Sequence, residues 1–371
     1  MRGIATLGTA LLCATVWAQD TGEFDHLPSL TKVQYRNPGL VVDLAVGLWA
    51  QPLPMDFDGD GDYDMVAATN DVPSNGIYFF ENVEGDVPDP VFKAGRRIGA
   101  AQHNITVSHP DGSPAQVLTP GRAHQDFATR GIEGGDAIPL ELELPFERIR
   151  ANQWKVADYN GDGRMDLVIG VGVWDDYGWD DAFTNDGEWT NGPLHGYVYI
   201  ALGERGPNGE RAYAKPFQLM AGGEPIDTYG APSPNLADFD GDGDLDLICG
   251  EFLDGLTYFE NTGTCSEPVY SKGRRLSRDG QEIRMDLQML QVLSMDWDKD
   301  GHTDLIVGQE DGRIAFVRNT GEVKDRMPVF DLPRFFRQEA EALKVGVLPT
   351  PVSVDWDGDG DEDLITGDTA G

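Results

Sequence analysis

The chain has 371 residues, 40% of them hydrophobic, so it is long enough to bury one or two cores. With 64 acidic and 28 basic residues the net charge is −36, and no basic stripe is present, which argues against nucleic acid and anionic membrane surfaces as partners. After Ala18 only Cys249 and Cys265 remain, which excludes a disulfide-stapled fold and leaves a bond between these two open.

Residues 1–18 have the pattern of a secretory signal peptide. Arg2 is followed by a largely apolar run and then by Ala18 at the cleavage point. The apolar run is shorter than the ~18–20 residues that a membrane anchor needs. Cys13 would suit a lipoprotein, but a large residue precedes it. The sequence therefore predicts a secreted protein, extracellular or periplasmic, without membrane insertion, whose folded part spans residues 19–371.

Residues 31–35 and 40–44 are predicted to form two strands around a turn. A nine-residue acidic loop then occurs five times. Its polar side chains occupy positions 1, 3, 5 and 9, and a glycine at position 6 permits the sharp bend that brings them together. A hard cation with oxygen ligands, Ca²⁺ above all, binds such a point. The candidate ligands are Asp56, Asp58, Asp60, Asp64; Asp158, Asn160, Asp162, Asp166; Asp238, Asp240, Asp242, Asp246; Asp296, Asp298, Asp300, Asp304; and Asp355, Asp357, Asp359, Asp363.

Ordinary turns are the alternative interpretation, since Asp and Gly both tolerate turn dihedrals. Five copies with one spacing favour calcium, because four carboxylates in one loop repel one another without a cation. Two copies depart from the pattern: Asn160 replaces an aspartate, and Lys299 stands where the other copies have glycine. The affinity of those two sites is therefore open. We expect up to five structural Ca²⁺ ions, with a melting temperature that falls in chelator.

Each of the first four loops lies within a predicted unit of four short strands. The loop joins the first strand to an apolar, buried second strand. The third strands are rich in aromatic and β-branched residues and are predicted at 77–82, 197–200, 256–261 and 314–319. The fourth strands are expected to begin at Pro90, Pro216, Pro268 and Pro328, because proline suits the start of an edge strand. The last three loops begin at residues 238, 296 and 355, a period of about 60 residues that is typical of propeller blades.

These loops and strands resemble the FG-GAP/VCBS repeat family, the calcium-binding blades also found in integrin α subunits, and Gly230-Ala231-Pro232 matches the family's GAP element. The resemblance covers residues 40–371 and implies an all-β fold, a β-propeller of four-stranded antiparallel blades with four complete blades and part of a fifth. Family members typically have seven blades, which implies a longer protein. The lead-in strand would then pair with the last blade. Dockerin and thrombospondin-type calcium repeats share the loop but repeat at shorter intervals.

Two insertions, about 99–150 and 174–195, are expected on the face opposite the calcium loops. The second carries aromatic residues among acidic ones, a composition that suits stacking on sugar rings. The candidate ligand-binding residues are Trp174, Tyr177, Trp179 and Trp189. The alternative is a loop whose aromatic residues pack on one another.

The first insertion holds candidate catalytic groups, namely His103, His109, Arg122, His124 and Arg130. A histidine base beside an arginine that neutralises a uronate would suit β-elimination. No phosphate-binding loop, nucleophile elbow or zinc constellation occurs. The first functional hypothesis is therefore a secreted calcium-binding adhesion or binding module for a polysaccharide or an extracellular protein. The second is a carbohydrate-active enzyme, most plausibly a polysaccharide lyase, so the sequence leaves open whether the chain is an enzyme.

Overall fold

The computed structural model describes residues 39–367 except 71, 73–74, 111–113, 134, 179–181 and 341–348. The signal peptide, the strand expected at 31–35 and Trp179 lie outside the described residues. Within them the chain is all-β, and its one helix is the four-residue α1 (Phe127–Arg130). No helix in this part of the chain has the length and apolar character needed to cross a bilayer.

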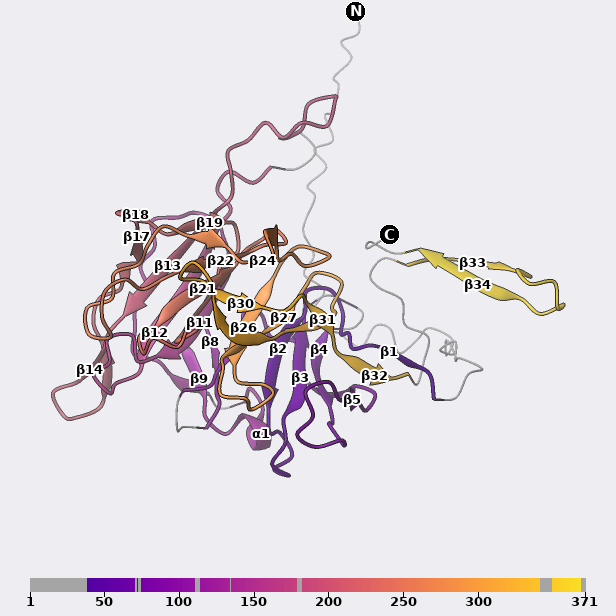
Figure 1. Cartoon of the computed structure of the whole chain (residues 1–371), viewed down its shortest axis with the longest axis horizontal. Helices are drawn as coiled ribbons and strands as arrows, with labels where there is room; N and C mark the ends of the chain where they lie inside the picture. Colours follow the sequence, from indigo (N-terminus) through magenta and orange to yellow (C-terminus); the bar gives the residue numbers. More distant parts are fainter. Residues whose placement is uncertain are drawn as a thin grey trace, which may run out of the picture.

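Five antiparallel sheets of four or five strands contain most of the described strands (Figure 1). They are, in strand order, β2 (Gln51–Met55), β3 (Asp64–Thr69), β4 (Gly76–Phe80) and β6 (Arg96–Gly99); β7 (Thr106–Ser108), β8 (Gln116–Thr119), β9 (Arg122–His124) and β10 (Asp136–Ala137); β11 (Ile149–Ala157), β12 (Asp166–Val173), β13 (His195–Ala201) and β16 (Phe217–Gln218), with β19 (Asp227–Tyr229) also on β13; β20 (Ser233–Ala237), β21 (Asp246–Gly250), β22 (Leu256–Phe259) and β23 (Arg274–Arg275); and β26 (Gln291–Met295), β27 (Asp304–Gly308), β28 (Ile314–Val317) and β31 (Arg334–Phe335).

The remaining strands form small sheets of two or three strands. One has three strands, β1 (Val41–Asp43), β32 (Arg337–Glu339) and β5 (Val91–Phe92). The others are the pairs β14 (Gly203–Arg205) and β15 (Arg211–Tyr213), β17 (Met220–Ala221) and β18 (Glu224–Pro225), β24 (Ser277–Arg278) and β25 (Gln281–Glu282), β29 (Asn319–Val323) and β30 (Pro328–Phe330), and β33 (Thr350–Val354) and β34 (Asp363–Gly367).

The predicted hairpins around the acidic loops are confirmed. Each loop joins two adjacent antiparallel strands: β2 to β3, β11 to β12, β20 to β21, β26 to β27, and β33 to β34. The second strands β3, β12, β21 and β27 are buried along their whole length, as their short apolar runs predicted. The third strands β4, β13, β22 and β28 also lie where the aromatic and β-branched runs were found.

The first strands of the five sheets contact one another in chain order. β2 contacts β7, β7 contacts β11, β11 contacts β20, β20 contacts β26, and β26 contacts β2. Apolar clusters fill the spaces between neighbouring sheets: one joins β8 and β9 to β11 and β12, a second joins β12 and β13 to β21 and β22, and a third joins β21 and β22 to β27 and β28. A fourth contains residues from β2, from β7 and β8, and from β26 and β27. Burial of apolar surface between adjacent sheets thus holds the five together.

The lead-in segment pairs with residues close to the last of the five sheets. β1 runs antiparallel to β32, and the Leu44 N–H donates to the Phe336 carbonyl at 2.7 Å. The Phe336 N–H donates in turn to the carbonyl of Ile314 in β28. The lead-in segment thus pairs beside the sheet that carries the fourth acidic loop, whereas the expectation was a pairing with the last blade.

The prediction of proline-led fourth strands is wrong in three of four cases. Only β16 follows its proline directly and pairs with the third strand of its sheet. Elsewhere the proline-led segment lies beside the end of the third strand without joining its sheet: the Lys93 N–H donates to Glu81 O at 2.8 Å, Tyr270 forms a bridge with Asn261, and β30 pairs with β29. The fourth strands β6, β23 and β31 begin a few residues later. Proline has no N–H to donate to the hydrogen bonds between strands. The proline therefore marks the turn at which the chain comes back toward the sheet, and the paired strand follows it.

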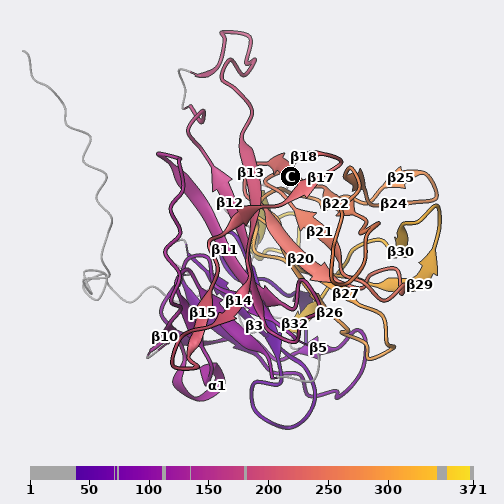
Figure 2. The same cartoon turned by 90° about the vertical axis from the view of Figure 1, so that its left-hand side faces the viewer.

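The stretch 99–150, expected as an insertion, contains the sheet of β7 to β10. Its strands are only two to four residues long and no acidic loop precedes β8, so no repeat pattern announced them. The second insertion is the connection between β12 and β13, and it extends away from the end of the molecule where α1 lies (Figures 1 and 2). Phe127 of α1 packs near Phe57 of the first acidic loop, with ring centroids 6.4 Å apart. The connection therefore projects from the face opposite that loop.

The two cysteines do not bond to each other. Cys249 is buried and Cys265 is exposed, and both are free thiols, so the disulfide that the sequence left open does not form.

The hairpin of β33 and β34 lies apart from the five sheets (Figure 1), with nearly all of its residues exposed.

Candidate functional site

The five acidic loops share one position in the fold, between the first and second strands of a hairpin. We name them loop 1 (56–64), loop 2 (158–166), loop 3 (238–246), loop 4 (296–304) and loop 5 (355–363). In loops 1, 3 and 5 the first aspartate accepts the N–H of the glycine three residues later, at 2.7–2.8 Å. That glycine has a φ of +79° to +85°, which explains its place at position 4. In loop 4 Lys299 adopts the same region, with a φ of +57°.

The ninth-position aspartate ties each of the first four loops to its sheet. Asp64 is fully buried and accepts the N–H of Phe57 at 3.0 Å and the N–H of Asn82, just after β4, at 2.9 Å. Asp166, Asp246 and Asp304 occupy the same buried position. Burial raises the pKa of Asp64 to about 6 and that of Asp304 to about 7. These aspartates therefore fix the loop shape as well as offering an oxygen ligand.

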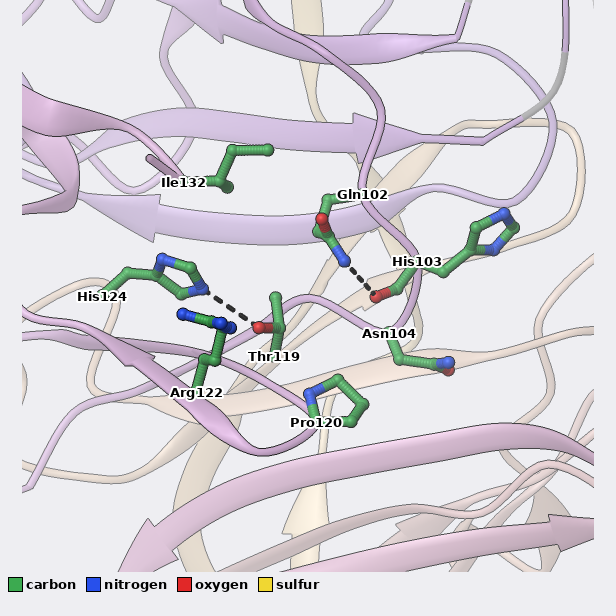
Figure 3. Close-up of a pocket in the computed structure, with 8 residues that line it drawn as sticks. All are labelled: Gln102, His103, Asn104, Thr119, Pro120, Arg122, His124 and Ile132. Carbon is green, nitrogen blue, oxygen red and sulfur yellow. Dashed lines mark hydrogen bonds between the residues drawn. The ribbon is translucent and has the colours of Figure 1, made fainter. Parts of the chain in front are cut away.

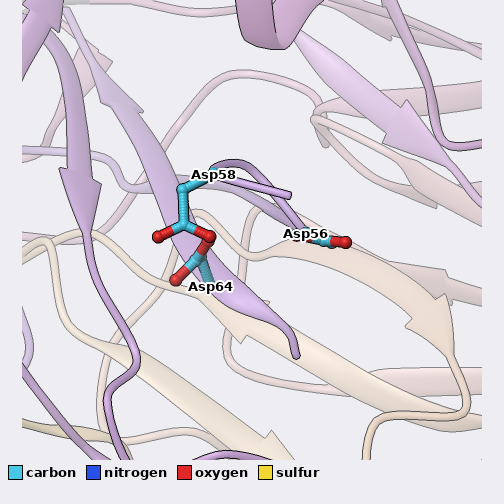
Figure 4. A group of neighbouring side chains, drawn as sticks. All are labelled: Asp56, Asp58 and Asp64. Atoms are coloured by element: carbon cyan, nitrogen blue, oxygen red, sulfur yellow. The ribbon is translucent and has the colours of Figure 1, made fainter. Parts of the chain in front are cut away.

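In four of the five loops three carboxylates offer oxygens that lie within 4.8 Å of one another. The groups are Asp56, Asp58 and Asp64; Asp238, Asp240 and Asp242; Asp296, Asp298 and Asp300; and Asp355, Asp357 and Asp359. Figure 4 shows the first group, with the carboxylates of Asp58 and Asp64 side by side. Loop 2 does not form such a group, which accords with the amide of Asn160 at its third position.

The seventh residue of loops 1 and 3 has a carboxylate oxygen that is available to a hard cation. Asp62 and Asp244 each keep one buried carboxylate oxygen without a hydrogen-bond partner. Burial raises the pKa of Asp62, and the neighbouring carboxylates of Asp60 and Asp58 raise it further. The pKa of Asp244 is raised to about 6 by burial and by Asp242. A divalent ion coordinated by oxygen would both use these acceptors and relieve the repulsion among the carboxylates.

Loops 2 and 4 carry their own cations. In loop 2 Arg164 takes the seventh position and bonds Asp162 at 2.8 Å. In loop 4 the guanidinium of Arg318, which follows β28, contacts both Asp298 at 2.7 Å and Asp300 at 2.5 Å. Lys299 of loop 4 pairs with Asp86 and reaches loop 1, where its amino group donates to the Gly61 carbonyl at 3.4 Å. The carboxylates of loop 4 are therefore partly used by protein cations, whereas in the described part of the chain no ion pair involves the carboxylates of loops 1 and 3.

The aromatic residues of the second insertion pack on one another. Trp174 is only 6% exposed, and its ring lies 4.3 Å from that of Tyr177 and 5.3 Å from that of Phe252. The guanidinium of Arg150 covers it at 4.2 Å. The ring centroids of Tyr177 and Trp189 lie 5.9 Å apart, and both side chains are partly exposed. Of the predicted ligand-binding residues described, Trp174 thus supports the loop, and Tyr177 and Trp189 offer ring surface.

Three candidate catalytic residues of the first insertion line one cavity of about 510 Å³ (Figure 3). His103, Arg122 and His124 are among its eight lining residues, and none of the eight is acidic. His124 is buried, its Nε2 lies 3.0 Å from the Thr119 hydroxyl, and its Nδ1 has no partner. Burial and then the charge of Arg122 lower the pKa of His124, so its imidazole is neutral at pH 7. His103 lies at the other end of the cavity.

The other candidates lie elsewhere. His109 is partly exposed, desolvation lowers its pKa to about 4, and its ring lies 6.3 Å from that of Tyr63. Arg130 on α1 faces Asp126 at 3.7 Å. His195 on β13, a histidine outside the first insertion that was not among those candidates, contacts Asp227 at 2.7 Å. None of these three lines the cavity.

Sequence reasoning missed a buried polar network where the first strands meet. Lys155 of β11 donates to the Asn235 side chain at 2.7 Å and to the Val292 carbonyl, and Gln153 donates to Gln291. Gln51 of β2 accepts the N–H of Ile105 at 3.1 Å. A signal was present, since each of these first strands carries polar residues within an otherwise apolar stretch.

Comparison with known proteins adds little to this geometry. No family model and no curated protein matches the chain. Among solved structures it is similar to the crystal structure of TcdB2-TccC3 without the hypervariable C-terminal region, at 14% identity and a TM-score of 0.35. The match covers 78% of this chain and only 16% of that chain, and a likeness of this level carries no functional argument.

Proposed function

We propose that the chain is a secreted calcium-binding β-propeller of the FG-GAP/VCBS kind, which binds a polysaccharide or an extracellular protein. The observation that carries this proposal is the acidic loop, which recurs five times at one position in the fold and brings three carboxylates together in four of its copies. The signal-peptide pattern of residues 1–18 supports export.

The cyclic contacts of the first strands support a propeller. In such a fold each sheet is a blade, the first strands line the axis, and apolar side chains fill the space between blades. The sheets that begin with β2, β7, β11, β20 and β26 meet in that order and return to β2. On this interpretation the sheet of β7 to β10 is a blade without a calcium loop.

Calcium would act as a structural ion in this fold. Each loop joins the two innermost strands of a blade, and without a cation its carboxylates repel one another. We therefore expect the melting temperature to fall when the ion is removed by a chelator and to recover on adding excess Ca²⁺. Differential scanning calorimetry of the full chain tests this, with Mg²⁺ as the control ion. Equal melting temperatures with chelator and with Ca²⁺ would refute the proposal.

Ligand binding is assigned to the face that carries the connection between β12 and β13. That connection projects from the fold (Figure 1), and the partly exposed rings of Tyr177 and Trp189 lie among acidic side chains. Aromatic faces beside hydrogen-bonding carboxylates suit sugar rings, and loops on a rigid scaffold commonly carry binding. A glycan array probed with the wild-type chain and with Trp189→Ala tests the assignment, because the variant should lose the signal.

A second candidate function, a polysaccharide lyase, is favoured by the cavity of the first insertion. Arg122 can pair with a uronate carboxylate, and a neutral imidazole can remove the proton at C5 while the C4–O bond breaks. The full chain would be incubated with uronate polysaccharides while the ultraviolet absorbance of unsaturated uronate is followed. A rise that His103→Ala or His124→Ala abolishes and His195→Ala preserves would establish the lyase. A flat trace would leave the binding module.

A further inference from the structure

We propose that Arg318 takes the place of the metal ion in loop 4, so that this loop keeps its shape without calcium while loops 1 and 3 require it. The inference rests on the proposed calcium function and separates loops that the sequence pattern treats as alike. It concerns which of the acidic loops are metal sites, and it follows from charges outside the nine-residue motif.

The contacts of Arg318 are those of a counter-ion. Its Nε lies 2.7 Å from Asp298 Oδ2, and a second nitrogen lies 2.5 Å from Asp300 Oδ2. Asp298 is only 6% exposed at its side chain and Asp300 23%. One planar guanidinium therefore joins the third and fifth positions, which are two of the ligands that a Ca²⁺ ion would use. A partly buried arginine in this geometry stays charged and compensates both carboxylates.

Loops 1 and 3 have the opposite charge at the corresponding position. Arg318 precedes Asn319, whose N–H donates to the ninth-position aspartate of loop 4 at 2.7 Å. Asn82 and Asn261 make the same hydrogen bond in loops 1 and 3, at 2.9 and 2.8 Å. The residues before them are Glu81 and Glu260.

In loop 3 the glutamate, Glu260, is itself paired with protein cations. Its carboxylate contacts Arg326 at 2.5 Å and Arg274 at 3.8 Å. In the described part of the chain neither arginine forms an ion pair with a carboxylate of loop 3. The same place in the fold thus holds an arginine that neutralises loop 4 and a glutamate that supplies no counter-charge to loop 3.

The buried carboxylate oxygens without a hydrogen-bond partner also separate loops 1 and 3 from loop 4. Asp62 in loop 1 and Asp244 in loop 3 each keep a buried carboxylate oxygen without a partner. Among the described residues of loop 4 no buried carboxylate oxygen is left without one. His302 stands at the seventh position there, so loop 4 also lacks the acidic residue that supplies the unpartnered oxygen in loops 1 and 3. A divalent ion entering loop 4 would displace Arg318 from its two carboxylates and lie beside its charge.

The test counts calcium ions per chain by equilibrium dialysis and follows terbium luminescence as a second readout. Asp60→Ala should lower the wild-type count by one, which reports that loop 1 binds. Asp300→Ala in the wild-type background should leave the count unchanged. Arg318→Gln should raise the count by one, and Arg318→Gln combined with Asp300→Ala should return it to the wild-type value. Arg318→Glu, which copies the charge of loops 1 and 3, should also gain one ion.

The outcomes separate the inference from the function on which it rests. If Asp300→Ala alone lowers the count, or if Arg318→Gln does not raise it, Arg318 does not replace the ion, while loss at Asp60→Ala still upholds calcium binding. If no variant and no wild-type chain binds calcium, the proposed function fails as well. Melting temperature provides an independent readout: in chelator Arg318→Gln should melt below the wild type, and added Ca²⁺ should restore it to a greater extent than it restores Asp300→Ala.

Discussion

The amino group of Lys155 is enclosed between the first strands of three sheets. It donates to the Asn235 side chain at 2.7 Å and to the Val292 carbonyl, both of them neutral acceptors. Burial lowers the pKa of Lys155 to about 7, because the charged form loses its hydration without gaining a carboxylate in exchange. A lysine in the unfolded chain has its ordinary value of 10.5.

This difference makes stability depend on pH. Between pH 7 and 9 the unfolded chain holds a proton on Lys155 that the folded chain has released, so the free energy of unfolding should rise with pH, by at most about 1.4 kcal/mol per pH unit. Lys155→Met should remove that rise. Denaturant titrations at pH 7, 8 and 9 in saturating Ca²⁺ measure it, with the exposed Lys215→Met as control. Parallel curves for the wild type and Lys155→Met would contradict the assignment.

At the level of elements, the segment of residues 230–232 illustrates a close backbone approach. Residues 230–232 pass over β12 and β13, and a Cβ on Gly196 of β13 would overlap the carbonyl oxygen of Gly230. A Cβ on Gly172 of β12 would lie 3.0 Å from the Cα of Ala231. The glycines of these two strands therefore make room for the segment, which contributes its own backbone to the packing between the sheets of β11 and β20.

Gly196→Ala should accordingly destabilise the chain by about 1–3 kcal/mol, the usual cost of overpacking a filled space. Gly367→Ala is the matched control, since it also lies in a strand but its added methyl group would meet nothing within 4 Å. Urea unfolding monitored by tryptophan fluorescence gives both values. A Gly196→Ala variant as stable as the control would show that the segment can move aside.

The elements that could be predicted are those whose sequence pattern is local. The acidic loops and the strands on either side were predictable because their pattern is local, with all ligands and the bend inside one short motif. The sheet of β7 to β10 was not, since its short strands carry neither that loop nor a repeat period. Arg318 was not either, because it lies outside the motif, beyond the end of β28, and meets loop 4 only once β27 and β28 pair.

At the level of the whole molecule, the net charge of −36 predicts which classes of partner are repelled, but it does not predict how the side chains are arranged. The cavity with His103, Arg122 and His124 is a region without acidic lining on an otherwise acidic chain. Its members come from separate segments, with His103 before β7 and the other two in β9. The sequence predicted all five residues as candidates without distinguishing among them. The folded chain, in which β8 pairs with β9, places three of them around one cavity, and His109 and Arg130 do not line it.

The pairing of β1 with β32 has a consequence for how the chain reaches its fold. The first described strand must meet one that is synthesised much later, because Val41 pairs with Glu339. Contacts of such long sequence separation give a high contact order, and high contact order slows folding. On a ribosome that adds about 5–20 residues per second, β1 must wait many seconds for its partner to be synthesised. The sheet of β1, β32 and β5 can therefore form only after residue 339 has emerged.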